Sequence, residues 1–224
     1  NAFFGCAYLT SVTIPESVTS IGEAAFQACY ALESIAIPDG VTALNNNIFN
    51  FCRRLKNIRL PSALQTIGDY AFANCSSLDS FVVPDSVVSI GSAAFLQDTA
   101  LTSVTFGKSL VQIGGSAFTD CAALGTLVFA EESSLREIGT YAFSGAAALE
   151  SVSLPEGVET IGYAAFLECT QLRSVELPST VTEIEQFAFL ESGLYNDALE
   201  NDETYVYAGR FPAFSRGFDS PLRL

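Results

Sequence analysis

The chain has 224 residues, 49% of them hydrophobic, and its 25 acidic and 10 basic side chains give a formal net charge of −15. A surface of this sign repels phosphate backbones, so nucleic acid is not an expected partner. No apolar run approaches the roughly 18 residues of a membrane span, so we expect no membrane insertion. Histidine is absent, which removes Ser-His-Asp and Cys-His nucleophile pairs, zinc sites that use imidazole, and the usual general base near neutral pH.

Methionine is also absent, and the chain opens with Asn1-Ala2-Phe3, inside a motif that recurs further on. We therefore expect a fragment or a processed form. The missing secretory signal then says nothing about export.

A unit of 23 residues repeats along the chain, and its clearest form runs from Ile21-Gly22 through Phe26 and Cys29 to Leu32. A fixed period in this range predicts a solenoid, because a lone coil cannot bury its apolar face and is stabilised by its neighbours. One interval is stretched to 25 residues, as the phenylalanine series shows: Phe3, Phe26, Phe49, Phe72, Phe95, Phe118, Phe143, Phe166 and Phe189.

Within each unit the residue types change in a fixed order. The alternation at Ile35-Ala36-Ile37 predicts a short strand with one buried face, and Pro38 ends it because proline has no amide hydrogen for the ladder. Asp39-Gly40 then turns the chain, and the small-Phe pair followed by Cys favours a single helical or 3₁₀ turn on the back of the coil. Strands in register form a parallel sheet, and a back with room for one turn predicts a shallow arc.

The periodic part ends near residue 192. We predict a solenoid of about eight coils over residues 1–192, with the first coil truncated. Residues 193–224 break the period, and we interpret them as a C-terminal cap over the exposed end of the last coil, or as the start of a further module.

The motif Ile-Gly-x-x-Ala-Phe-x-x-Cys-x-x-Leu-x-x-Val-x-Ile-Pro resembles the leucine-rich repeats of the BspA-like family of bacterial and trichomonad surface proteins. Departures occur at Asn45-Asn46-Asn47, at Gly107 in place of Pro, and at Glu131-Glu132 in the stretched interval. The resemblance implies an α/β repeat protein: a right-handed solenoid with one short parallel strand per coil on the concave face and short helical turns on the convex side. It also implies a surface-exposed or secreted protein that attaches to host proteins, matrix or other cells.

Six cysteines share one position of the repeat, and Asp98, Ala146 and Ser192 occupy it in other coils. Cys121 is two coils, roughly 10 Å, from the nearest of the others, beyond the reach of a disulfide. We therefore expect buried thiols acting as small hydrophobes. The set is Cys6, Cys29, Cys52, Cys75, Cys121 and Cys169.

The outward positions of the predicted strands carry mostly small residues, which lets a partner's backbone or a glycan approach closely. Arg59 is an exception, and with Arg53, Arg54, Lys56 and Asn57 it forms a basic cluster that could clamp a carboxylate, a sulfate or a sialylated glycan. A solvated patch that balances nearby acids is the alternative. The candidate ligand-binding residues are Arg59, Lys56, Asn57, Arg54, Ser34, Ser80, Ser103 and Thr105.

The expected function is therefore a non-catalytic binding or adhesion module for a protein or glycan, without a cofactor or a catalytic or metal site. A structural spacer is one alternative, a carboxylate-based glycan hydrolase is another, and a cytosolic scaffold is also compatible with free thiols. The acidic and amide side chains near the C-terminus lack the oxygen spacing and central glycine of an EF-hand loop, so they predict no dedicated Ca²⁺ site. These residues are Asn196, Asp197, Glu200, Asp202 and Glu203.

Overall fold

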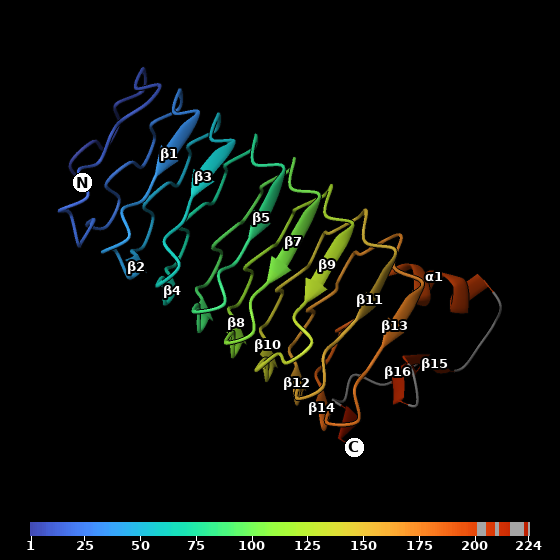
Figure 1. Ribbon diagram of the computed structural model, residues 1–224. Helices are drawn as coiled ribbons and strands as arrows, with labels where there is room; N and C mark the ends of the chain where they lie inside the picture. Colours follow the sequence, from blue (N-terminus) through green and yellow to red (C-terminus); the bar gives the residue numbers. More distant parts are fainter. Residues whose placement is uncertain (201–204, 209–210, 216–221, 224) are drawn as a thin grey trace.

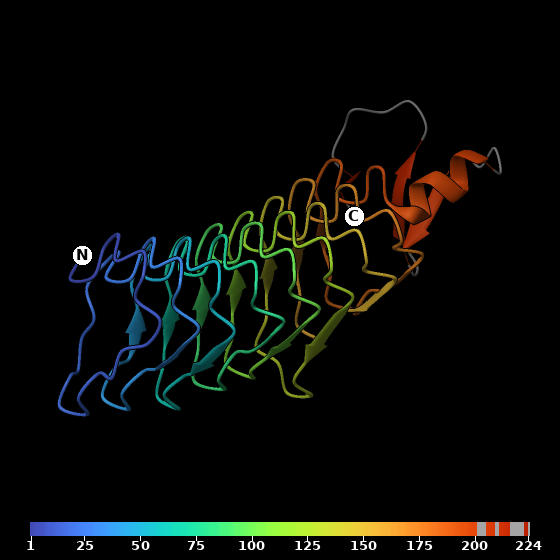
Figure 2. The same cartoon turned by 90° about the horizontal axis from the view of Figure 1, so that it is seen from above.

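The computed structural model describes residues 1–200, 205–208, 211–215 and 222–223, with side chains placed up to residue 197. The repeats form stacked coils that follow one another in a row with only a shallow bend (Figures 1 and 2). The predicted solenoid is confirmed.

From the second coil onward, each coil contributes one strand of three or four residues to one side of the solenoid, here named the long-strand side, as the alternating pattern predicted. These strands are β1 (Ser34–Ala36), β3 (Asn57–Arg59), β5 (Ser80–Val82), β7 (Ser103–Phe106), β9 (Thr126–Phe129), β11 (Ser151–Ser153) and β13 (Ser174–Glu176). All pairing among them is parallel and in register, so that Ser34 lies beside Asn57 and Ser80 beside Ser103. The ladder is not continuous, because it divides into β1-β3, β5-β7-β9 and β11-β13.

A second sheet, which the sequence did not predict, runs along another side of the coils. Its seven parallel two-residue strands end at the Ile, or in one coil Leu, that precedes the Gly position, and they pair without a break. They are β2 (Ala43–Leu44), β4 (Thr66–Ile67), β6 (Ser89–Ile90), β8 (Gln112–Ile113), β10 (Glu137–Ile138), β12 (Thr160–Ile161) and β14 (Glu183–Ile184).

The back of each coil differs from the predicted helical or 3₁₀ turn. It is a series of β-turns, in which the N–H of Ala71 donates to the carbonyl of Gly68 and the N–H of Cys75 donates to the carbonyl of Phe72. Tyr70 and Asn74, the third residues of these two turns, have φ of 54° and 63°. Positive φ at this position is the mark of a type II turn and cannot continue a right-handed helix.

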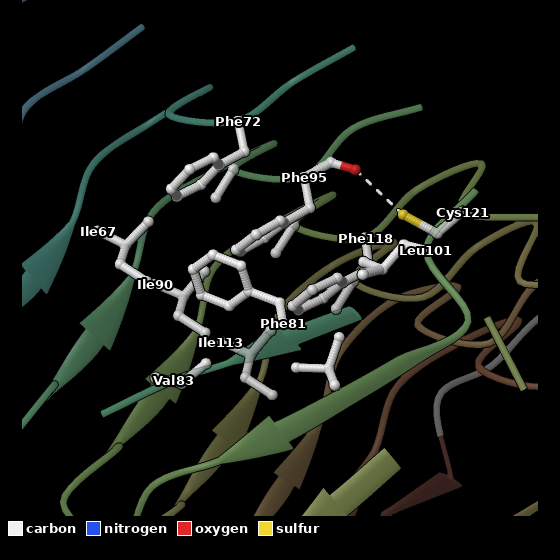
Figure 3. Close-up of a cluster of buried hydrophobic side chains, with 14 of the residues drawn as sticks. Ile67, Phe72, Phe81, Val83, Ile90, Phe95, Leu101, Ile113, Phe118 and Cys121 are labelled. Carbon is white, nitrogen blue, oxygen red and sulfur yellow. Dashed lines mark hydrogen bonds between the residues drawn. The ribbon is translucent and has the colours of Figure 1, made fainter. Parts of the chain in front are cut away.

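The interior is filled by the phenylalanine series, whose neighbouring rings stack with centroids 4.9–5.6 Å apart. Figure 3 shows three of these rings, Phe72, Phe95 and Phe118, in one row beside Ile67, Ile90 and Ile113 of the short-strand sheet. From Phe49 onward each ring of the series is fully buried. Identical rings meeting in register are therefore the continuous core that the 23-residue period predicted.

After the last coil the chain forms helix α1 (Gly193–Glu200), then β15 (Tyr205–Ala208), β16 (Phe211–Ser215) and β17 (Leu222–Arg223). The N–H groups of Gly193 and Leu194 donate to the carbonyls of Cys169 and Leu172, and Leu194 packs against the core. Strand β17 pairs antiparallel with β14 at the end of the short-strand sheet. Whether residues 193–224 are a cap or part of a further module stays a prediction.

Candidate functional site

The outward side chains of the seven long strands form one surface, here named the long-strand face. Its outward members alternate with inward ones that are buried in most strands, as Ser34, Ile35 and Ala36 illustrate. The face is lined mainly by Ser, Thr, Ala and Val, and Val82 is 66% exposed. The surface is thus shallow and offers few long side chains to a partner.

One depression of about 890 Å³ lies on this face, over β1, β3 and β5. Of the eight predicted binding residues, five line it: Ser34, Lys56, Asn57, Arg59 and Ser80. Ser103 and Thr105 lie on β7, one strand beyond the lining, and Arg54 lies in the turn before β3. The structure therefore brings together the middle of the predicted set and leaves three members outside the depression.

Three cations of the predicted basic cluster face carboxylates that lie one or two coils away. Arg59 is 3.2 Å from Asp39 and 3.6 Å from Glu16, and Lys56 is 3.5 Å from Asp79. Arg54 likewise faces Glu33, at 3.6 Å. All these side chains are more than half exposed, and exposed pairs of this kind contribute only about 0–1 kcal/mol. An incoming anion would compete with them at little cost.

Arg53 takes no part in this arrangement. Its guanidinium lies over the ring of Tyr30, 5.3 Å from the centroid, and 5.8 Å from the ring centroid of Phe51. The four cations are therefore divided between ion pairs and aromatic stacking and do not converge on one point.

The predicted burial of the cysteine column is confirmed at five positions, and at Cys6 it is wrong, because that residue is exposed. Each buried thiol donates to the carbonyl of the phenylalanine one coil earlier. Cys52 Sγ, for example, lies 3.1 Å from the oxygen of Phe26. Burial raises the pKa of Cys29 to about 11 and that of Cys169 to about 12. These thiols are poor nucleophiles and hold the coils together.

Asp98 occupies the same position and is fully buried. Its Oδ1 accepts the N–H of Cys75 at 2.7 Å, whereas Oδ2 has no partner. Burial raises the pKa of this carboxyl well above its usual range. Enclosed by the core, Asp98 cannot meet a substrate.

The structure also contains features that sequence reasoning missed. The thiol hydrogen bonds join residues of successive coils and depend on how the coils stack. The sequence of a single repeat therefore does not predict them. The interruption of the ladder between β3 and β5 has a visible correlate, because Phe81 replaces the aliphatic residue found at the central inward position of the other long strands.

The acidic residues near the C-terminus are only partly described. Asp197 forms an ion pair with Arg173 at 3.2 Å, while Asp202, Glu203 and the side chain of Glu200 lie outside the described part. Among the described residues, no three Cys, Asp or Glu side chains are grouped so that they could hold a metal ion. In the same residues no helix is long and apolar enough to cross a bilayer.

Comparisons with known proteins agree with this architecture. The family model for the BspA type leucine rich repeat region, in six copies, matches residues 1–99 and 88–213. No curated protein matches the chain.

The chain is similar to solved structures of bacterial leucine-rich repeat proteins. A leucine-rich repeat protein from Bacteroides ovatus is 30% identical over 83% of this chain, with a TM-score of 0.74, and the chain spans half of that protein. The leucine-rich repeat protein of T. pallidum is 28% identical, with a TM-score of 0.61, over 69% of this chain and 72% of its own. The repeat, the stacked coils and the match to the family model agree, and the chain belongs to the BspA type leucine-rich repeat family.

Proposed function

We propose that the chain is a non-catalytic binding module of a surface-exposed or secreted protein, and that it recognises a protein or a glycan through the long-strand face. The observation that carries this proposal is the depression over β1, β3 and β5, which combines exposed small side chains with Lys56, Asn57 and Arg59. Small residues let a partner's backbone approach, and the charged groups at the rim supply directional contacts.

The chemistry of the depression favours binding over catalysis. Asp79 is the single carboxylate among its lining residues, whereas glycoside hydrolysis uses two carboxyl groups about 5–10 Å apart. The five buried thiols and Asp98 lie in the core, away from this surface. A hydrolase would need a second carboxylate opposite Asp79, whereas the nearby Asp39 and Glu16 are paired with Arg59.

The proposed location and partners rest on family membership. Surface proteins of this type attach to host proteins, matrix or other cells, as the repeat's resemblance implied. The chain spans half of the Bacteroides ovatus protein, so the rest of such a protein can add its own activities. If the long-strand face binds nothing, the chain acts as a spacer that displays other domains.

Binding of the purified chain to immobilised matrix proteins and to a glycan array tests the proposal. In the variant Ser80→Trp, a bulky uncharged side chain is placed in the depression, and we expect a loss of affinity of at least about tenfold, or roughly 1.4 kcal/mol. Gln65→Trp is the matched control, because Gln65 is exposed beside the short-strand sheet. Equal binding by both variants would contradict a role for the long-strand face.

Arg59 allows a sharper test of the anionic part of the proposal. Arg59→Ala removes the cation nearest the centre of β3, and binding to a sulfated or sialylated glycan should weaken and lose part of its salt dependence. An unchanged affinity would refute the binding of an anion by Arg59. It would not affect the proposal that the rest of the long-strand face binds a partner.

A further inference from the structure

The long-strand side of the solenoid opens between β3 and β5. These two strands share no hydrogen bond, and their Cα atoms mostly lie more than 8 Å apart, whereas hydrogen-bonded strands lie about 4.8 Å apart. The two coils that carry β3 and β5 stay hydrogen-bonded on their other sides. Ahead of these strands in the chain, the N–H of Phe49 donates to the carbonyl of Ala71 at 2.8 Å, and after them Ile67 pairs with Ile90. The coils therefore separate on one side only.

The backbone groups that face the opening can be identified from the pairing around it. The N–H of Asn57 and the carbonyl of Arg59 are bonded to the coil of β1, so the groups of Ile58 face β5. On the other side, the N–H of Val83 and the carbonyl of Asp79 are bonded to the coil of β7, so the groups of Ser80 and Val82 face β3. One coil earlier, the N–H of Ile37 donates to the carbonyl of Arg59. The equivalent bond, from the N–H of Leu60 to the carbonyl of Val82, is not present.

The floor of the opening is apolar. Ile58 and Leu60 are partly exposed, whereas Ile35 and Ile37, at the same positions one coil earlier, are only 4% and 0% exposed. Phe81 completes this floor and lies among the lining residues of the depression. Its ring is 5.0 Å from the ring of Phe72 and 4.7 Å from that of Phe95, both edge to face (Figure 3).

We propose that this opening is a β-augmentation site, in which an extended peptide segment of a partner protein lies between β3 and β5 and bonds to both edges. The inference rests on the proposed function and names its partner class. A single strand centred between two others needs them about 9.6 Å apart, twice the ordinary spacing. Unpaired N–H and C=O groups on two facing edges are complementary to another strand, since backbone bonds supply the affinity in this mode of recognition.

The surroundings define which peptide fits. An inserted strand places alternate side chains inward, where a small apolar residue such as Val or Ala would contact Ile58 and Phe81. Lys56 and Asp79 bridge the opening near the start of the strands, with Nζ 3.5 Å from the carboxylate oxygen. Both side chains are more than half exposed, so a passing peptide can displace this pair and contact Lys56 with an acidic residue of its own.

Amide hydrogen exchange measured by NMR tests the free protein first. The N–H groups of Leu60, Ser80 and Val82 should exchange rapidly, and that of Val83, bonded to Thr105 at 2.9 Å, should be protected. Slow exchange at all four positions would mean that the ladder is closed in solution and would overturn the proposal.

Peptides selected from a displayed random decapeptide library against the whole chain provide the second test. A selected peptide should slow exchange at Leu60, Ser80 and Val82, and its counterpart with N-methylated backbone amides should lose at least tenfold in affinity. If the N-methylated form binds as well, or if only glycans bind in the opening, the backbone-pairing site is refuted.

A disulfide cross-link between β3 and β5 provides the third test. In Asn57→Cys/Ser80→Cys the cross-link forms only when β3 and β5 approach within the roughly 7 Å that a disulfide spans, and it should abolish peptide binding until it is reduced. The control Ser151→Cys/Ser174→Cys staples two strands that already pair in register and should leave binding unchanged. If the cross-linked protein still binds matrix proteins through the long-strand face, peptide binding in the opening is refuted, whereas the proposed function is retained.

Discussion

The thiol of Cys121 donates to the carbonyl oxygen of Phe95, one coil earlier, at a Sγ···O distance of 3.0 Å (Figure 3). The same oxygen accepts the N–H of Asp98 at 3.2 Å, so one carbonyl joins two successive coils. The bond recurs from Cys29 to Phe3, Cys52 to Phe26, Cys75 to Phe49 and Cys169 to Phe143. The cysteine position therefore supplies a small donor as well as a small apolar volume.

Replacing Cys121 tests that interpretation. We expect Cys121→Ala to lower the free energy of unfolding by about 1 kcal/mol through the lost contact and bond, and Cys121→Ser to retain a donor and cost less. Urea denaturation followed by circular dichroism gives the comparison. Cys6→Ala is the control, because replacing the exposed Cys6 should change the free energy of unfolding by no more than about 0.5 kcal/mol. Similar losses of stability in Cys6→Ala and Cys121→Ala would contradict a stabilising role for the thiol hydrogen bond.

Asp98 interrupts the cysteine column with a buried carboxyl whose Oδ2 has no partner. Cys75 and Cys121 flank it, and their own thiol pKa values are raised by burial and by the Asp98 charge. A buried polar atom without a partner costs about 1–3 kcal/mol. We therefore expect Asp98→Cys, which restores the repeat, to raise the free energy of unfolding at pH 7 by about that amount.

The stability of the wild-type chain should depend on pH through the same group. Because the pKa of Asp98 is raised in the folded protein, its contribution is fully present below the unfolded value of about 3.9. That contribution is lost as the pH rises toward the folded value, at up to roughly 1.4 kcal/mol per pH unit. Asp98→Asn keeps the acceptor for Cys75 and does not titrate, so the difference in unfolding free energy between variant and wild type should grow from pH 4 upward. A constant difference would show that Asp98 titrates normally.

The repeat made most of the fold predictable, because 23 residues separate each buried position from its copy. Ile35 pairs with Ile58 and Phe26 stacks on Phe49, as any in-register solenoid requires. The short-strand sheet and the β-turns at the back of each coil could not be predicted from the repeat in this way. A two-residue strand such as Thr66–Ile67 carries no alternation, and non-glycine residues with positive φ, such as Tyr70, have no strong residue preference here.

The candidate site was predictable in its position along the strands and unpredictable in its electrostatics. Lys56, Asn57 and Arg59 line one depression, since register fixes which side chains are neighbours. The ion pairs of Lys56 with Asp79 and of Arg59 with Asp39 and Glu16 join side chains about 20 to 40 residues apart in the sequence, and they depend on how the turns between strands project them. The opening between β3 and β5 has one correlate in the residue pattern, the aromatic Phe81 at a position that is aliphatic in the other long strands.

The glycine that follows five of the short strands, β4, β6, β8, β10 and β12, reflects the close approach of neighbouring coils. A Cβ at Gly91 would lie 2.6 Å from the backbone of Gly68 and Asp69, whereas a Cβ at Gly22 would have nothing within 4 Å. Gly91→Ala should therefore lower the free energy of unfolding by about 1–3 kcal/mol or more. Gly22→Ala at the same repeat position should be neutral or raise the free energy of unfolding by about 0.4–1 kcal/mol, because alanine lowers the conformational entropy of the unfolded chain. Thermal unfolding of the two variants checks this contrast, and equal melting temperatures would contradict tight coil contact as its cause.

Phe81 is aromatic where the other long strands have Ile, Leu or Val at the central inward position, and we attribute the opening beside β5 to the bulk of its ring. Phe81→Ile should let β5 approach β3, restoring bonds worth roughly 1 kcal/mol each. Exchange at Leu60 and Ser80 should then slow by at least about tenfold, which corresponds to about 1.4 kcal/mol. Val104→Ile is the control, because Val104 holds the same position in β7, which pairs on both sides. Should Leu60 and Ser80 exchange as fast in Phe81→Ile as in the wild type, the ring is not what holds the two strands apart.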